Sequence, residues 1–532
     1  MKNFWNKSLL LSGAFALVAS VSSFSHAQSS NPRLFEIDGQ GALRTLQSEA
    51  GIHDYLGTLM NDPSTVQIQR VNVKAALIAA DTQMLSLPLP DGREVNFQLK
   101  RFNTSVPGMD GWVGDVPSDR TQRFTSDAEV DMDPFNWISL VRDGDQLVGS
   151  IHVDGQAYRL EYVGAGQHVL VKVDESKLPP EAEPMPSPEI DNVDLTVGHI
   201  PQSAHSTIRV LFVSTELSRA KYPNYRAQLV KALQDANQSM INSRVNITYE
   251  LAGFHDADYN EEGHSYGAQL SSLTKRETDL GREVYRTRDA LRADLVSMLS
   301  TGREYCGLAY VNAGKSSAYS VISCLGSLAH ELGHNLGATH NWEPGQAEGN
   351  PPYMYGYRYT GTPRFRTQLS YDCSGGTCPR VLYHSNPRVT YQGIPVGTAR
   401  NHDVARRFNE RRETVENFYP PVLDVTLYEH SHHAGRACRF IQEVGSAIDV
   451  RQQCGAEWGS IVSSAKVLGL APGITVRFEG APGHYEEFIS KAYRGALPVY
   501  LFGEYPDMSS DIDWVKTGFS INDKVSRVSI SR

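Results

Sequence analysis

The feature that most restricts the fold is a short run near the middle of the chain. Residues 330–340 read HELGHNLGATH, a complete H-E-x-x-H-x-x-G-x-x-H pattern. Residues four apart on an α-helix lie on the same face, so His330 and His334 can direct their imidazole nitrogens at one metal ion. The spacing therefore predicts a helix that carries a metal site.

The remaining positions of the pattern complete a site that suits zinc. Glu331 leaves the helix beside the histidines, where its carboxylate can accept a proton from water rather than bind the metal. A straight helix would carry His340 too far along its axis, but Gly337 can adopt a positive φ, end the helix and let the chain bring His340 back. Three neutral imidazoles leave a fourth position open, as in catalytic zinc sites. The alternative, an ordinary amphipathic helix with surface histidines, does not account for Gly337 and His340 in register.

This run resembles the zinc signature of the metzincin metallopeptidases. The surrounding residues 205–420 resemble reprolysin-like bacterial enzymes, including the peptidyl-Asp metalloendopeptidases. The phrases that carry the resemblance are YCGLAY (305–310), PYMYGY (352–357), SYDC (370–373) and YHSNP (383–387). The resemblance implies an α/β (α+β) catalytic domain with a mixed sheet and a zinc helix, and Zn²⁺-dependent hydrolysis of peptide bonds.

Two positions depart from the metzincin pattern. Metzincins carry a methionine in a tight turn beneath the zinc, and in the matching phrase TQLSY (367–371) this position is Leu369. Leucine has a similar volume, so we expect the floor of the site to be retained; Met354 is the second candidate for this turn. Asn341 stands where reprolysins usually have aspartate. Tyr371 follows the turn where, in related families, a tyrosine can hydrogen-bond a developing oxyanion; the alternative is a tyrosine packed in the core.

The beginning of the chain predicts export. Residues 1–27 read as a secretory signal, with Lys2 and Lys7 ahead of or beside an apolar run at 9–21 and a small-x-small cleavage site at 25–27. The apolar run is shorter than the roughly 20 residues that span a membrane, and no later segment qualifies. We therefore expect a secreted, extracellular protein without a membrane span. The net charge of −10, with no basic stripe, argues against nucleic acid as a partner.

Six cysteines agree with an oxidising destination. Pairing of neighbours would give the disulfides Cys306–Cys324, Cys373–Cys378 and Cys438–Cys454, although other connectivities stay open. The first bridge would brace the strands that lead into the zinc helix.

The residues before the catalytic region read as a propeptide followed by a linker. Residues 28–175 contain no cysteine and show strand-like alternation between Asp-Gly turns, which predicts a β-rich fold. Residues 176–204 are assigned to the linker, since 174–194 contain five prolines, seven acidic residues and one lysine. A propeptide without cysteine cannot block zinc with a thiolate. Asp110 or Asp115 could serve instead, although ordinary turn aspartates are the alternative.

Strand and helix patterns alternate through the catalytic region, which indicates an α/β sandwich around a mixed sheet. We expect strands at 208–213, 245–251, 306–311 and 318–322, and helices at 225–241 and 288–299.

Residues 422–532 change to short strands and Gly/Pro turns, which predicts a separate all-β domain. This region resembles the βγ-crystallin Greek-key domain at residues 427–429 with Gly435, and at 522–526. The second phrase resembles a calcium-binding motif, which makes Asn522, Asp523 and Ser526 candidate Ca²⁺ ligands. Arg527 replaces the final serine of that motif, so a stabilising or adhesive module without calcium is the alternative.

Together these features predict a multidomain, secreted zinc endopeptidase, made as a zymogen, that acts on protein or peptide substrates. His330, His334 and His340 are expected to hold the zinc, with Glu331 as the general base toward the zinc-activated water. The competing class is a secreted binding or adhesion protein in which the Greek-key module functions and the protease fold is a scaffold. It is disfavoured because all three ligands and the base are present.

Cleavage specificity is the least defined property. The resemblance to peptidyl-Asp endopeptidases hints at an acidic preference, which would need a basic pocket. Arg358, Arg364 and Arg366 lie near the motif in the sequence, although arginines are common on surfaces. The oligomeric state is not defined by the sequence.

Overall fold

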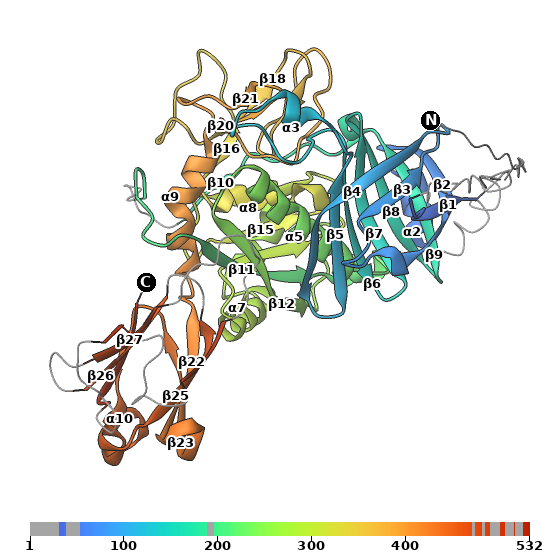
Figure 1. Cartoon of the computed structure of the whole chain (residues 1–532). Coiled ribbons are helices and arrows are strands. Elements are labelled where there is room, and N and C mark those ends of the chain that lie inside the picture. The colour runs from blue at the N-terminus through green and yellow to red at the C-terminus, as the bar shows by residue number, and fades with distance from the viewer. Residues whose placement is uncertain are drawn as a thin grey trace, which may run out of the picture.

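The computed structural model of the protein describes residues 31–38, 54–188, 196–470, 474–480, 485–489, 501–505, 515–516 and 525–531. The expected signal segment and the candidate calcium ligands Asn522 and Asp523 lie outside these residues. Within the described residues, no helix is both long and apolar enough to cross a membrane. Figure 1 shows three parts: a blue-to-teal N-terminal sheet, a green-to-yellow central domain and an orange-to-red C-terminal module.

The N-terminal part is a nine-stranded sheet with the order β1-β2-β9-β8-β7-β6-β5-β4-β3. Its strands are β1 (Phe35–Ile37), β2 (Thr65–Val73), β3 (Met84–Pro88), β4 (Glu94–Val106), β5 (Met109–Asp115), β6 (Trp137–Asp143), β7 (Gln146–Val153), β8 (Gln156–Gly164) and β9 (Gln167–Val173). The backbone of Ser86 exchanges hydrogen bonds with Leu34 and Pro32, so the chain before β1 meets β3 at the other edge. The β-rich pattern of the sequence is thus realised as a sheet whose edges meet.

One face of this sheet packs on helix α5 (Tyr225–Asn242) of the central domain (Figure 1). The apolar part of the contact is a buried cluster of Val141, Val148, Ala227 and Val230. At its border Lys231 Nζ donates to Ser150 Oγ at 2.8 Å. Asp62, just after helix α2 (Asp54–Asn61), pairs with Arg303 at 2.8 Å. The sheet is therefore attached to the central domain by both apolar and charged contacts.

The central domain contains a six-stranded mixed sheet with the order β10-β14-β15-β13-β11-β12. Its strands are β10 (Met185–Pro186), β11 (Ser206–Ser214), β12 (Ile247–Asp256), β13 (Leu295–Leu299), β14 (Gly307–Val311) and β15 (Tyr319–Ile322). Only β14 and β15 pair antiparallel, and β10 joins the edge of β14 from the segment after the N-terminal sheet. The helices are α4 (Glu216–Lys221), α5, α6 (Tyr266–Thr274), α7 (Asp279–Leu291), α8 (Leu328–Asn335) and α9 (Val404–Glu416). This is the mixed α/β architecture that the sequence predicts.

The prediction of a helix at residues 288–299 is wrong. Helix α7 ends at Leu291, where Arg292 adopts the left-handed conformation with φ 52° and ψ 48°. The next element is β13, whose five residues are all buried between β11 and β15. A short apolar run carries no periodicity that separates a buried strand from a buried helix, so the pattern joined the end of α7 to β13.

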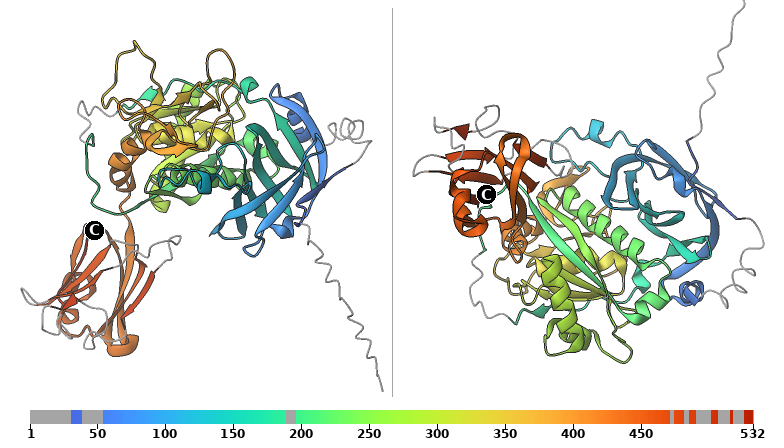
Figure 2. Two further views of the ribbon diagram at one scale, coloured as in Figure 1. Left: turned by 45° about the horizontal axis from the view of Figure 1, so that its top comes forward. Right: turned by 90° about the horizontal axis from the view of Figure 1, so that it is seen from below.

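The C-terminal module consists, in its described part, of two sheets with the orders β23-β22-β25-β28 and β24-β30-β26-β27-β29. Their strands are β22 (Val422–His430), β23 (Ala434–Glu443), β24 (Ala447–Asp449), β25 (Ser464–Leu470), β26 (Thr475–Glu479), β27 (Tyr485–Ile489), β28 (Leu501–Tyr505), β29 (Val515–Lys516) and β30 (Arg527–Ser531). Leu423, Val467, Val476 and Ile530 belong to the apolar core that both sheets share. Figure 2 shows the module on the opposite side of the central domain from the N-terminal sheet.

Candidate metal centre

Helix α8 is short, and all of its residues are buried. Leu328, Leu332 and Leu336 recur at helical spacing and pack into the core of the central domain. The disulfide Cys306–Cys324 ties the start of β14 to the turn that precedes the helix. The strand and the helix that frame the site are therefore covalently linked. The other two bridges also join sequence neighbours, Cys373–Cys378 and Cys438–Cys454.

Gly337 ends the helix and reverses the chain. Its φ is +88°, and its N–H donates to the His334 carbonyl at 2.8 Å. A Cβ at this position would also lie 2.8 Å from the Arg407 guanidinium. The chain then enters β16 (Thr339–Asn341), from which His340 faces the helix again. The motif predicts this reversal, and only a residue without a side chain suits both the backbone and the space.

The three imidazoles converge on one point. The Nε2 atom of His330 lies 2.9 Å from that of His334 and 3.1 Å from that of His340. Nitrogens bound to one zinc ion at its usual bond length lie about 3.3 Å apart. The Nδ1 atoms of His330 and His334 hydrogen-bond the carbonyls of Gln368 at 2.8 Å and Ala338 at 2.9 Å. Since a carbonyl only accepts, the proton is on Nδ1 and the Nε2 lone pair is free for a metal.

Burial keeps these imidazoles neutral. His330 and His334 have no exposed surface, and His340 is 5% exposed. Burial lowers the pKa of His334 to about 4 and that of His340 to about 2. Burial and the two neighbouring imidazoles hold the pKa of His330 well below its usual range. Three neutral, converging nitrogen donors are the ligand set of a catalytic zinc site, so these residues fit a zinc ion.

Glu331 lies beside this cluster with 1% of its surface exposed. Neither of its carboxylate oxygens has a hydrogen-bond partner among the described residues. Burial raises the pKa of Glu331 well above its usual range, and the nearby Glu181 carboxylate raises it further. On β14, Gly307 leaves room for this carboxylate, because a Cβ there would overlap it and lie 2.6 Å from the Glu331 Cγ. The site therefore contains an unpaired buried carboxylate directly between strand and helix.

The turn at residues 367–370 forms the floor beneath helix α8. Leu369 is 1% exposed and packs in the same core as the helix. Its methyl groups lie so close to Gly333 that a Cβ there would be 2.9 Å away. The second candidate, Met354, has its side chain next to Gly349 instead. Leu369, which the sequence aligns with the methionine of that turn, therefore packs against helix α8, whereas Met354 contacts a different segment.

Tyr371 lies next to the third histidine. Its ring centroid is 4.0 Å from that of His340, and its hydroxyl donates to Glu183 Oε1 at 2.7 Å. Partial burial and the Glu183 carboxylate raise the pKa of Tyr371. Asn341 accepts a hydrogen bond from the Tyr371 backbone N–H at 3.1 Å, which fixes the tyrosine relative to the histidine strand. The structure therefore places Tyr371 beside the cluster rather than in a distant core.

Comparison with known proteins identifies the family. A family model described as Metallo-peptidase family M12B Reprolysin-like matches residues 226–341. A peptidyl-Asp metalloendopeptidase of Stenotrophomonas maltophilia (strain R551-3) is 34% identical over 388 residues, covering 70% of this chain and 91% of that protein. Another, of Xanthomonas campestris pv. campestris, is 31% identical over 381 residues, covering 69% and 89%. The chain belongs to this family of metallopeptidases. The predicted zinc metalloendopeptidase is thereby confirmed, and the binding-protein alternative is not favoured.

A solved structure of a double mutant of a betagamma-crystallin domain from Clostridium beijerinckii is 21% identical to part of this metalloendopeptidase. It covers 20% of this chain and 94% of its own, with a TM-score of 0.12. In the C-terminal module Ser526 donates its hydroxyl to the Gly480 carbonyl at 2.9 Å. Among the described residues, the groups of His, Cys, Asp or Glu that could hold a metal all contain His330.

A segment of the expected linker lies along the edge of β14 in this metalloendopeptidase. The Cys306 N–H donates to the Pro180 carbonyl at 2.8 Å, and the Ala182 N–H donates to the Gly307 carbonyl at 3.3 Å. Further on, β10 continues parallel to β14. The segment from 180 to 186 thus adds a strand to the sheet next to the histidine cluster.

The acidic side chains of this segment face the site. Glu181 Oε1 accepts hydrogen bonds from Arg380 Nη2 and Ser327 Oγ, both at 2.7 Å. Its other oxygen, Oε2, is buried and has no partner among the described residues. Glu183 is mostly exposed, and its Oε2 lies 3.5 Å from His340 Nδ1. Two linker carboxylates therefore lie beside the metal site, Glu181 next to the start of helix α8 and Glu183 next to His340.

The two aspartates considered as inhibitory ligands lie elsewhere. Asp110 pairs with Arg142, and Asp115 accepts a hydrogen bond from the Asp133 backbone N–H at 3.0 Å. Neither belongs to a group of possible metal ligands in the described part of the chain, whereas Glu181 does. Sequence reasoning missed Glu181 because the acidic residues around it indicate only an extended linker. The signal available was the acidic run itself, directly before the catalytic region.

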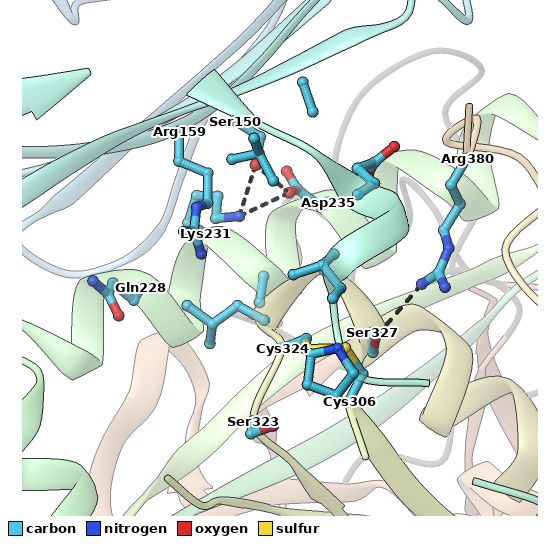
Figure 3. Close-up of a pocket in the computed structure, with 18 of the residues that line it drawn as sticks. Ser150, Arg159, Gln228, Lys231, Asp235, Cys306, Ser323, Cys324, Ser327 and Arg380 are labelled. Carbon is cyan, nitrogen blue, oxygen red and sulfur yellow. Dashed lines mark hydrogen bonds and ion pairs between the residues drawn. A yellow bond between two sulfur atoms is a disulfide. The ribbon is translucent and has the colours of Figure 1, made fainter. Parts of the chain in front are cut away.

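A cavity of about 550 Å³ lies between this segment, the central domain and the N-terminal sheet (Figure 3). Arg366 and Arg380 line it. Of the arginines considered from the sequence, only Arg366 does so: Arg358 pairs with Glu343, and Arg364 is directed at backbone carbonyls near residue 375. Sequence proximity to the motif therefore selected one of the four arginines that line the cavity in the described part of the chain, and missed Arg380 along with Arg159 and Arg303.

Proposed function

We propose that this zinc metalloendopeptidase is exported as a latent precursor and, once mature, hydrolyses peptide bonds next to acidic residues. One observation supports this proposal most directly: three converging imidazoles, a buried glutamate without a hydrogen-bond partner among the described residues, and an added strand lie together at one sheet edge. The acidic preference is inferred from the relatives, which are peptidyl-Asp metalloendopeptidases.

The proposed roles of the residues follow from their geometry. His330, His334 and His340 hold the zinc through Nε2, and a bound zinc ion would lower the pKa of water and polarise the peptide carbonyl. Glu331 accepts the proton of the attacking water and delivers it to the leaving amine. Its carboxylate suits this role because no donor of the described chain occupies it. Tyr371, freed from Glu183, donates its hydroxyl to the developing oxyanion.

The substrate backbone is proposed to bind along β14. An extended peptide can add a strand to a free sheet edge and use main-chain hydrogen bonds for affinity. The linker segment already makes such bonds with Cys306 and Gly307. In the precursor it occupies the edge that the substrate needs.

Latency is assigned to the N-terminal part of the chain. In this proposal residues 1–27 are the signal, 28–175 the propeptide, 176–204 the linker, 205–420 the catalytic domain and 422–532 a Greek-key domain. Export agrees with three disulfides, which persist in oxidising compartments. Glu181 and Glu183 close the site until the linker is cut and released.

The decisive experiment replaces the proposed base. Glu331→Gln should keep one bound zinc per chain, measured by atomic absorption, and lose casein hydrolysis by about 10²–10⁴-fold. Glu277→Gln makes the same change at an exposed position and should retain full activity. Equal activity of the two variants would remove Glu331 from the mechanism.

A further inference from the structure

Arg380 is a cation set into the wall of the site rather than on the surface. Its side chain is 15% exposed, and its backbone forms a bridge with Arg366. Figure 3 shows its guanidinium reaching toward Ser327, beside the Cys306–Cys324 disulfide. Its partner Glu181 belongs to a group with His330 and Glu331 whose ligand atoms all lie within 4.8 Å of one another. A partly buried guanidinium this close to the metal site needs an anion to offset its loss of hydration.

The anion that Arg380 has in the structure comes from the linker. Among the described residues, Glu181 is the carboxylate that pairs with it, at 2.7 Å with 4% of the glutamate side chain exposed. Ser327 adds a second hydrogen bond to the same oxygen. When the linker leaves, the central domain supplies no replacement carboxylate at this distance in its described part. The Arg380 guanidinium then has no carboxylate partner and retains its hydrogen bond to the Ser327 hydroxyl at 3.4 Å.

Glu181 lies on the segment that pairs with the strand edge where we propose that the substrate binds. Its neighbours Pro180 and Ala182 make the backbone hydrogen bonds to the strand edge. Its carboxylate comes within 4.8 Å of ligand atoms of His330 and Glu331. A peptide that adds to β14 in the same way would present one side chain to Arg380 beside the reacting bond.

The surroundings favour a negative charge and disfavour a neutral or positive one. Arg366 is 7% exposed and donates to the carbonyls of Cys378 and Ser370, so it is fixed behind the pocket. Burial, followed by the charge of Arg380, lowers the pKa of Arg366 to about 10. Two neighbouring guanidinium groups repel a cation and stabilise a carboxylate, which Arg binds with directional, charge-assisted hydrogen bonds.

We propose that Arg380, with Ser327 beside it and Arg366 behind it, is the receptor for the acidic side chain of the substrate. In the precursor, Glu181 binds to this receptor in place of the substrate side chain. The inference rests on the proposed peptidase function and deepens it, because it assigns the acidic preference to particular residues.

The test compares two peptides that differ only in Asp or Asn at the recognised position. The full chain is expressed, allowed to mature, and assayed as wild type, Arg380→Gln, Arg380→Lys and Arg364→Gln. The readout is the ratio of kcat/KM for the Asp peptide to that for the Asn peptide. Losing a charge-assisted hydrogen bond should lower this ratio about 10- to 100-fold in Arg380→Gln. Arg380→Lys keeps the charge without the planar fork and should lie between that value and the wild type.

Arg364→Gln is the matched control, because Arg364 lies in the same region of the chain and should leave the ratio unchanged. If Arg380→Gln leaves the ratio of kcat/KM for the Asp and Asn peptides unchanged, Arg380 is not the receptor. This holds even if the uncut precursor of that variant is more active than the wild-type precursor. If Arg380→Gln is inactive on both peptides, Arg380→Lys decides by the same ratio. A wild-type chain that cleaves neither peptide nor casein would instead refute the proposed function.

Discussion

Replacing Glu181 by Gln is the most direct test of the latent state. The change keeps the size of the side chain but removes the charge that Arg380 and Ser327 contact, both at 2.7 Å. Charge-assisted hydrogen bonds contribute roughly 1.5–3 kcal/mol each, and neutral ones roughly 0.5–1.5 kcal/mol. The difference is about 1–1.5 kcal/mol for each bond, so the loss for the two bonds together is about 2–3 kcal/mol before any rehydration of Arg380, whose side chain is 15% exposed. This corresponds to an increase of about 30- to 150-fold in the population of molecules whose linker segment is detached from β14.

Two assays report this opening. In a Glu331→Gln background, which prevents self-cleavage, the Ala182 amide bonded to Gly307 should exchange its hydrogen about 30- to 150-fold faster. In the otherwise native chain, the uncut precursor should hydrolyse a short peptide faster by a similar factor. Mass spectrometry establishes that the linker is intact at the start of each measurement.

Glu183→Gln is the matched control for this prediction. It makes the same chemical change two residues along, at a carboxylate whose side chain is 81% exposed. Exposed ion pairs contribute about 1 kcal/mol or less, so the opening should rise by about fivefold at most. If Glu181→Gln opens the segment no more than Glu183→Gln does, the buried pair with Arg380 is not what closes the site.

Two further predictions concern the strand beside the site and the N-terminal sheet. Gly307→Ala should displace the Glu331 carboxylate and lower kcat at least tenfold, while the zinc content stays unchanged. Gly326→Ala is the control and should have no effect, because a Cβ there meets nothing within 4 Å. Normal activity of Gly307→Ala would contradict the close contact between Gly307 and Glu331. Burial raises the pKa of Asp62, but hydrogen bonds from Arg303 and Ser64 outweigh it and bring the pKa to about 2. Since this is below the unfolded value of about 3.9, the pair stabilises the fold above about pH 4 and loses this contribution as the pH falls toward 2. Scanning calorimetry should show that Tm falls less steeply with decreasing pH in Asp62→Asn than in the wild type. Parallel curves of Tm against pH for the two proteins would contradict the assignment.

The site could be predicted from the sequence where its residues are close together in the chain. Glu331, Gly337 and the three histidines lie within helix α8, the turn after it and the start of β16, so spacing and backbone preference were sufficient to bring them together. Helix α5 was also predicted because its long amphipathic pattern is unambiguous. Residues 288–299 were misread, since a short buried strand after a helix has no distinct period.

The residues that the sequence did not reveal meet only through tertiary structure. Arg380 and Glu181 are 199 positions apart, and nothing local marks either as a partner of the other. The composition of the expected linker indicates a segment without a core of its own. It gave no indication that the backbone of this segment forms hydrogen bonds with the edge of β14, because the addition of a strand depends on the geometry of the sheet that receives it.

The strand added by residues 180–186 has a consequence for the protein before it ever meets a substrate. A bare sheet edge offers unpaired N–H and C=O groups to any extended chain, and it is a common starting point for aggregation. In this structure Cys306, Gly307 and the rest of β14 are covered by the chain's own segment. The contact that we propose to delay catalysis would therefore also protect a newly folded molecule from pairing with its neighbours.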